Sequence, residues 1–169
     1  LSIIKEYGLP NTFGEDIKEE VKTIPQKVDE FEYSKRRNLT DKICFTIDGE
    51  DAKDLDDAVY VEKLEDGNYK LIVSIADVSY YVREKSNLDK EARLRGTSVY
   101  MFDRVIPMLP RKLSNGICSL NEGVDRLTKT CYMEINPKGK VVKYKIFDSV
   151  IKSKKKMTYE ELNELFKGN

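Results

Sequence analysis

The feature that most constrains this fold is a strongly acidic stretch, residues 48–57, between two apolar stretches. It holds six acidic residues and one lysine, a net charge of −5. Residues 42–47 and 58–62 on either side are rich in β-branched and aromatic side chains and are typical of strands. Because clustered carboxylates repel one another and are costly to bury, the stretch is predicted to be a loop joining two strands of a sheet.

The rest of the chain predicts a mixed α/β (α+β) fold with an antiparallel-rich sheet and helices on its surface. Two hairpin turns, at Asp66-Gly67 and at residues 137–139, separate further strand patterns. These strands are expected at residues 69–76, 129–136 and 140–151. Antiparallel neighbours joined by such short turns favour an antiparallel sheet.

Helices are indicated by apolar spacing and by capping residues. Ile17, Val21 and Ile24 share one helical face, and the residues after them, 25–40, show no period and are predicted to be a connector. Capping boxes mark two further helices, and Gly96 ends the first of them. These helices follow Ser86, which pairs with Asp89, and Thr158, which pairs with Glu161, with Leu162 and Leu165 expected inside.

Composition excludes several functional classes. The 169 residues contain 30 basic and 30 acidic side chains, so the chain is not a globally basic nucleic-acid coat. The absence of histidine excludes His-dependent nucleophilic catalysis and His-ligated zinc within the chain. No apolar run reaches the ~18 residues of a membrane span. Cys44, Cys118 and Cys131 form no CxxC pair, so reduced thiols and a cytoplasmic location are expected.

The acidic loop has the chemistry of a site for a hard divalent cation. Asp54 and Asp56 would share one face of an extended chain, Leu55 would point to the core, and a turn is needed to bring Asp57 to the same place. An EF-hand is excluded, because the sixth residue from Asp48 is Lys53 rather than glycine. From spacing alone, a metal site and a solvated acidic turn both remain open.

The run TIDGEDAKDLDDAV at residues 46–59 resembles the signature of the ribonuclease R/ribonuclease II family, whose catalytic domain is the RNB domain. The resemblance is greatest to ribonuclease R and extends from about residue 36 to the C-terminus. Other blocks that carry it are IADVS (75–79), LDKEA (88–92), RGTSVY (95–100), RVIPMLP (104–110), LSNGICSL (113–120) and SVIKS (149–153). Residues 36–169 therefore resemble the N-terminal part of an RNB domain, and residues 1–35 the lead-in helices and connector from a preceding cold-shock-type domain.

The resemblance implies a magnesium-dependent, processive 3′→5′ exoribonuclease that hydrolyses single-stranded RNA to nucleoside 5′-monophosphates in the cytoplasm. It places the four family aspartates on Asp48, Asp54, Asp56 and Asp57 as ligands of one or two Mg²⁺ ions, with Mn²⁺ as a substitute, and makes Asp56 the catalytic one. Carboxylates around two cations suit metal-assisted hydrolysis, since one ion can activate water and the other can neutralise the leaving oxygen. The expected partners are single-stranded RNA and the remaining domains of the same full-length chain, with no membrane.

Three other features have competing interpretations. Tyr100 corresponds to the family's aromatic that stacks on the RNA 3′ end, whereas its neighbours Val99 and Phe102 would also suit a core tyrosine. Residues 138–156, with eight lysines and one aspartate, form either a phosphate-tracking surface or a solvated hairpin face. Asp77 either approaches the metal ions or is a structural carboxylate that caps a turn, and the second is expected.

The sequence departs from the family at Ser74 and Tyr80, where histidines are usual, and packing changes are expected there. The family's later arginine, which steadies the scissile phosphate, and its second aromatic clamp have no counterpart in these residues. The chain alone is therefore expected to be an inactive fragment. The alternative is a non-catalytic RNA-binding or scaffold module that keeps the acidic pocket.

Overall fold

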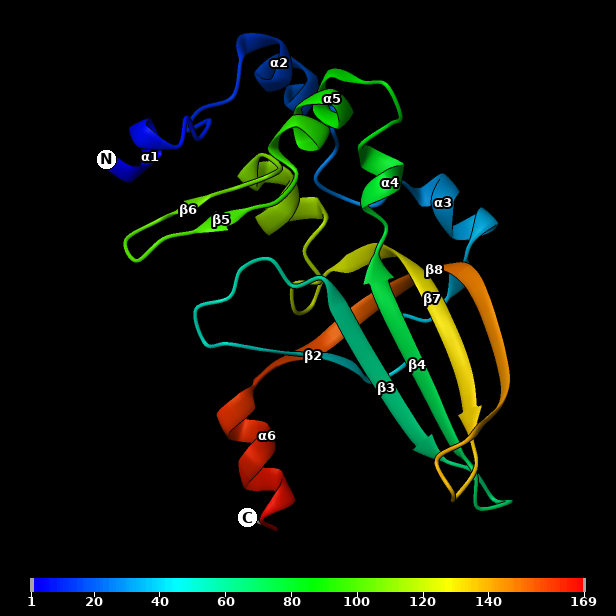
Figure 1. Cartoon of the computed structure of the whole chain (residues 1–169). Coiled ribbons are helices and arrows are strands. Elements are labelled where there is room, and N and C mark those ends of the chain that lie inside the picture. Colours follow the sequence, from blue (N-terminus) through cyan, green and yellow to red (C-terminus); the bar gives the residue numbers. More distant parts are fainter. Residues whose placement is uncertain (1, 169) are drawn as a thin grey trace.

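The computed structural model describes residues 2–168. Leu1 of the predicted lead-in segment 1–35 and Asn169 of the predicted RNB part 36–169 lie outside the described residues. Most strands belong to one sheet in the order β1-β8-β2-β3-β4-β7, and β8 also pairs with β7. The strands β2, β3, β4, β7 and β8 therefore close into a ring, and the helices other than the C-terminal one gather at one end of it (Figure 1). The mixed α/β fold and the largely antiparallel sheet predicted above are both confirmed.

The strands confirm the predicted hairpins, but β7 begins four residues before the predicted strand 129–136 and β8 ends seven residues after the predicted strand 140–151. A second, two-stranded sheet, β5 with β6, forms a separate hairpin. The strands are β1 (Arg37–Asn38), β2 (Cys44–Asp48), β3 (Asp57–Lys63), β4 (Tyr69–Ala76), β5 (Val99–Tyr100), β6 (Val105–Ile106), β7 (Asp125–Ile135) and β8 (Val141–Thr158). The pairs β3–β4, β4–β7 and β7–β8 are antiparallel, whereas β8 runs parallel to β1 and β2.

The helices are short, and most have identifiable end signals. Gly96, with a φ of 72°, ends α5, as predicted, because glycine adopts the left-handed conformation readily. The helices are α1 (Ser2–Glu6), α2 (Glu15–Thr23), α3 (Glu30–Lys35), α4 (Val78–Tyr81), α5 (Asn87–Arg95), α6 (Tyr159–Phe166) and the π-helix η1 (Leu113–Ile117). None of the helices in residues 2–168 is long and apolar enough to cross a membrane.

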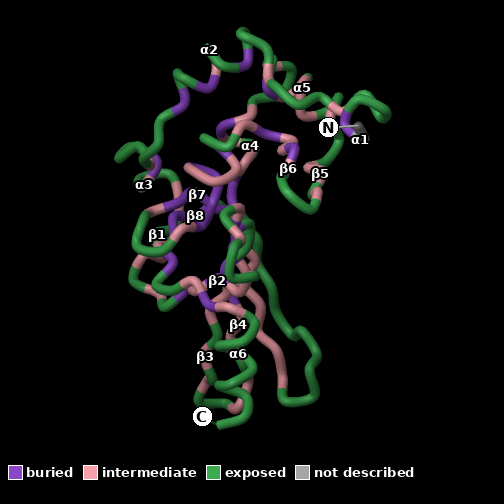
Figure 2. The backbone as a smooth tube through the Cα atoms, turned by 90° about the vertical axis from the view of Figure 1, so that its left-hand side faces the viewer, coloured by how far each residue is buried: buried purple, intermediate pink, exposed green. Residues whose placement is uncertain are grey.

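The core lies where the helices meet one end of the strand ring, and the far hairpin ends are exposed or half-buried (Figure 2). One cluster joins α2 and α5 to the segment around η1 through residues such as Ile17, Leu88 and Leu113. A second cluster lies at the acidic loop and consists of Cys44, Leu55, Ala58, Ala76, Leu120 and Ile151. The loop is thus attached directly to the core.

The inside of the ring contains a cluster of buried hydroxyl groups. Ser149 Oγ lies 2.6 Å from both Thr128 Oγ1 and Thr130 Oγ1, and Ser74 Oγ lies 2.8 Å from Thr130 Oγ1. All four side chains are fully buried. Each hydroxyl can donate and accept, so the cluster satisfies its own polar groups without water.

Three sequence predictions need correction. The segment 25–40 is not a structureless connector: it contains α3, whose N-cap Asp29 accepts a hydrogen bond from Phe31 N, and β1. The capping box of α5 is only half formed, since Asp89 accepts from Lys85 N instead of Ser86 N. The capping box of α6 is complete, but Leu165 on this helix is 58% exposed rather than inside.

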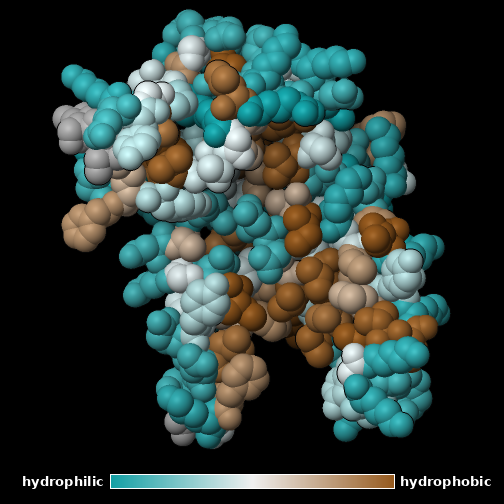
Figure 3. Space-filling model, in the orientation of Figure 1, coloured by the Kyte–Doolittle hydropathy of each residue, from teal (hydrophilic) through white to brown (hydrophobic). Residues whose placement is uncertain are grey.

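An apolar row crosses the outer face of the sheet. Val61 pairs with Leu71, Leu71 with Met133, and Met133 with Tyr144, so these side chains share one face. Val61 and Tyr144 are exposed, and Leu71 and Met133 are half-buried. Apolar residues gather over the lower part of the sheet in Figure 3.

Candidate active site

The acidic loop spans one end of the strand ring. Asp48 is the last residue of β2 and Asp57 the first of β3, and these strands are antiparallel neighbours. Their aspartates therefore lie at the same end of the ring, as the loop passes beneath the β5–β6 hairpin (Figure 1). A turn closed by Ala52 N donating to Gly49 O, 3.1 Å, supplies the change of direction that the sequence required.

Leu55 divides the loop into an inner and an outer side. It is 2% exposed, whereas Asp54 is half-buried and Asp56 is exposed. The alternation predicted from the sequence is therefore confirmed: Leu55 enters the core while the flanking carboxylates face outward. The backbone of Asp56 is held as well, since Ala76 N donates to Asp56 O at 2.9 Å.

The negative charges of the loop aspartates contribute to raising the pKa of two of them, Asp48 and Asp56. Partial loss of hydration, then the charges of Asp54, Asp57 and Asp48, raise the pKa of Asp56. Desolvation, then the charge of Asp57, raises the pKa of Asp48, while Lys156 acts in the opposite direction. The loop thus concentrates negative charge that a bound cation would relieve.

The donor set fits a hard divalent ion by its chemistry, because all four side chains offer carboxylate oxygens. In the described part of the chain, however, no three or more His, Cys, Asp or Glu side chains converge on one point that could hold a metal ion. Asp54 is instead turned to Tyr100, whose hydroxyl donates to Asp54 Oδ2 at 2.6 Å. The four aspartates share a neighbourhood without forming a ready-made cage.

Tyr100 lies on the rim of the site and not in the core. It is 65% exposed, so the alternative of a packed core tyrosine is wrong. The hydrogen bond to Asp54, followed by partial burial, raises the pKa of the Tyr100 hydroxyl to about 12. Its hydroxyl is tied to the acidic loop while much of the ring stays available for contact.

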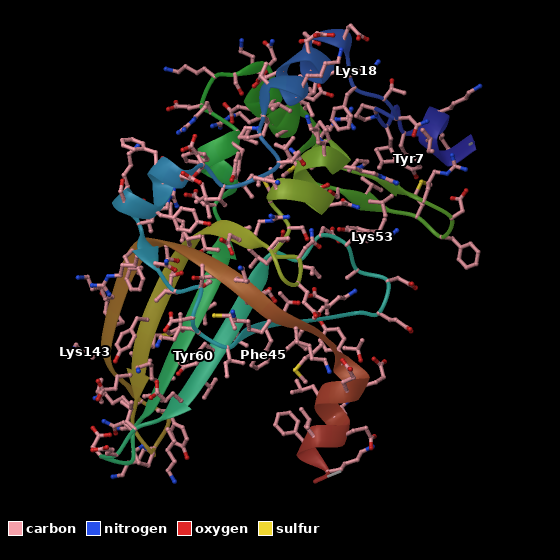
Figure 4. All side chains as sticks on the ribbon, turned by 180° about the vertical axis from the view of Figure 1, so that it is seen from behind. Tyr7, Lys18, Phe45, Lys53, Tyr60 and Lys143 are labelled. Carbon is pink, nitrogen blue, oxygen red and sulfur yellow. The ribbon has the colours of Figure 1, made fainter. Side chains whose placement is uncertain are left out.

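Two adjoining hollows flank Tyr100 and Asp54, with volumes of about 480 and 560 Å³. The lining of the first includes polar and basic residues that the sequence did not single out, namely Lys53, Ser98, Arg104, Arg111, Ser114 and Asn115. Figure 4 shows Lys53 on the acidic loop. Arg104 and Ser114 lie in blocks that carry the family resemblance, and this was the signal that could have identified them.

The C-terminal end of the lysine-rich segment holds the fold together. Lys156 Nζ donates to Glu50 O and Ala52 O at 2.7 and 2.8 Å, which fixes the first half of the acidic loop. Lys152 pairs with Asp125, and Lys155 with Glu161. These three lysines therefore have partners within the fold, and a phosphate-tracking surface over residues 138–156 stays a prediction. Residues 141–146 are exposed throughout, including the apolar Val142, Tyr144 and Ile146.

Asp77 is structural, as expected, but by a buried ion pair rather than a side-chain cap. Arg36 Nη2 lies 2.8 Å from Asp77 Oδ2, and Ser79 Oγ donates to Asp77 Oδ1. The departures from the family also pack inside the fold: Ser74 belongs to the hydroxyl cluster, and the Tyr80 ring lies beneath Arg36 and edge-on to Tyr81.

Comparison with known proteins decides the family. The RNB domain matches residues 36–169. The chain belongs to the RNB domain family. Its relatives include Ribonuclease R of Thermotoga maritima, 57% identical over 96% of this chain and 23% of that protein. Ribonuclease R 1 of Lactococcus lactis is 50% identical over the whole of this chain and 21% of that protein.

Solved structures agree with this assignment. The Mycoplasma genitalium RNase R in complex with double-stranded RNA superposes with a TM-score of 0.92 at 31% identity, covering 99% of this chain and 30% of that one. The RNB fold is therefore shared. This chain spans between a fifth and a quarter of the length of the curated relatives it matches.

Proposed function

We propose that the protein is a magnesium-dependent, processive 3′→5′ exoribonuclease that hydrolyses single-stranded RNA to nucleoside 5′-monophosphates. The observation that carries the proposal is the acidic loop, where four aspartates gather beside an exposed tyrosine and the neighbouring carboxylate charges contribute to raising the pKa of Asp48 and of Asp56. The relatives named ribonuclease R support the same reaction class.

The four aspartates would hold Mg²⁺ or Mn²⁺, and bound cations would supply an activated water and neutralise charge on the leaving oxygen. Asp56 follows the buried Leu55 in the chain, and it is proposed as the catalytic carboxylate. The Tyr100 ring would stack on a base at the RNA 3′ end, a contact that tolerates any sequence. Arg111, which lines the adjoining hollow, would neutralise an RNA phosphate.

The proposed setting is the cytoplasm, with RNA and the remaining domains of the full-length chain as partners. The cysteines support a reducing compartment, since all three are free thiols. For residues 1–169 alone, we expect weak Mg²⁺ binding without turnover. In the family, an arginine later in the chain stabilises the transition state, and losing one such contact costs roughly 10²–10³ in rate.

The test uses full-length protein and a 5′-labelled single-stranded RNA, with Mg²⁺ or with a chelator. Progressive shortening from the 3′ end and release of 5′-monophosphates in Mg²⁺ are expected. Asp56→Asn should bind RNA and fail to degrade it. Glu50→Gln removes an exposed acid from the same loop and should retain activity, which makes it the matched control. RNA binding without degradation by the wild type in Mg²⁺ and in Mn²⁺ would identify a non-catalytic module instead.

A further inference from the structure

One buried hydroxyl holds the backbone on both sides of Asp54. Ser119 Oγ donates to Lys53 O at 2.9 Å and accepts from Leu55 N at 3.0 Å. Ser119 is fully buried. Its single hydroxyl therefore uses both its donor and its acceptor capacity on the residue before Asp54 and the residue after it.

Ser119 is itself fixed to the strand ring. Arg126, on β7 and 7% exposed, donates from Nε to Ser119 O at 2.7 Å and from Nη2 to Gly116 O at 3.1 Å. The next residue, Leu120, donates its N–H to Leu55 O at 2.9 Å. The second half of the acidic loop is thus connected through Ser119 to a buried guanidinium on a strand of the ring.

The first half of the loop has a separate attachment, the Lys156 ammonium on Glu50 O and Ala52 O. Loss of the Ser119 hydroxyl would leave that attachment intact. It would remove the hydrogen bonds to Lys53 O and from Leu55 N, so Leu120 N on Leu55 O would be left to hold this backbone, and the N–H of a buried leucine would lose its acceptor. The movement would be confined to the part of the loop that carries Asp54 and Asp56.

We propose that Ser119 is a positioning residue for the hydrolysis, setting where the carboxylates of Asp54 and Asp56 stand when they hold the cation. The inference rests on the proposed ribonuclease function. Carboxylates that hold one cation must be positioned accurately, and a misplacement of a catalytic group by about 1 Å costs roughly a hundredfold in rate. Ser119 acts through the two aspartates and does not itself touch the reacting atoms.

The experiment measures the RNA degradation rate of the full-length protein against Mg²⁺ concentration for wild type, Ser119→Ala and Ser119→Thr. Ser149→Ala is the matched control, because Ser149 is equally buried and its hydroxyl hydrogen-bonds to Thr128 and Thr130 on a strand of the ring. For Ser119→Ala we expect the half-maximal Mg²⁺ concentration to rise about tenfold, equivalent to one hydrogen bond, and the maximal rate to fall at least tenfold. Ser119→Thr keeps the hydroxyl and should restore the Mg²⁺ dependence.

The outcomes separate this inference from the proposed function. A wild type that does not degrade RNA at any Mg²⁺ concentration would refute the function. An active wild type whose Ser119→Ala variant shows the same Mg²⁺ dependence as Ser149→Ala would overturn the role of Ser119. So would a threonine variant as impaired as the alanine variant. If Ser119→Ala does not fold, Ser119→Cys keeps the volume with a weaker hydrogen-bonding group, and an unchanged Mg²⁺ dependence in that variant refutes the inference.

Discussion

Truncating Leu55 should damage the acidic loop through the core. Leu55 is 2% exposed and packs with Cys44, Ala58, Ala76, Leu120 and Ile151. Removing its side chain forfeits the transfer free energy of three carbons and leaves a cavity, which for Leu→Ala costs about 2–5 kcal/mol. Because the loop on one side can relax inward, we expect the lower half of that range, about 2–3 kcal/mol, or roughly 4–12 °C in melting temperature.

The matched control is Leu88→Ala, which removes an equally buried leucine from the other core cluster, away from the loop. Both variants are compared in the full-length protein by urea unfolding and by RNA degradation at 25 °C, where both remain folded. Leu55→Ala should lose at least tenfold in rate beyond the loss of Leu88→Ala, since relaxation of the loop displaces Asp54 and Asp56. Equal rates in two equally destabilised variants would refute the view that Leu55 sets the site.

Three further predictions concern charge and stacking. Tyr100→Ala should weaken binding of the RNA 3′ end roughly ten- to a hundred-fold, whereas Tyr100→Phe, which keeps the ring, should stay within about threefold in a binding titration. The pKa of Asp56 is raised in the folded protein, so at pH values above the pKa of the unfolded state its ionised carboxylate destabilises the fold. Asp56→Asn should therefore have a higher melting temperature than wild type at pH 7 without Mg²⁺. Because Mg²⁺ binds the folded wild type, adding it should reduce that difference in melting temperature. Arg36→Gln should cost about 3–5 kcal/mol in urea unfolding, because the buried carboxylates of Asp77 and Glu32 lose the guanidinium that they share.

Regular strands and their hairpins were predictable because their signals are local. The predicted strand at residues 69–76 coincides with β4, and the inward turn of Leu55 follows from alternation along the loop. The short α3 escaped prediction because six residues give too little periodicity, although Asp29 offered a capping signal. The local sequence pattern placed the aspartates in one loop, but it could not identify the hydrogen bonds that hold this loop in place.

The attachments of the loop were beyond sequence reasoning because they join residues far apart in the chain. Ser119 contacts residues 53 and 55, and Lys156 contacts residues 50 and 52. The sequence around each residue does not point to the loop. Ser119 lies in a block that carries the family resemblance, and Lys156 is one of eight lysines in residues 138–156. Only the closed ring of strands brings them to the loop, and the side chains alone carry no signal of that closure.

The pairing of β8 with β2 has a consequence for synthesis of the chain on the ribosome. Asp48 pairs with Thr158, and Lys156 donates a hydrogen bond to the loop at Glu50 O. Lys156 is synthesised more than a hundred residues after Glu50. Contacts of such long range form late, after loop closure has been achieved. A nascent chain whose β8 is still inside the ribosome therefore lacks an assembled acidic loop, so any chemistry of this loop becomes possible only after that part of the domain has emerged.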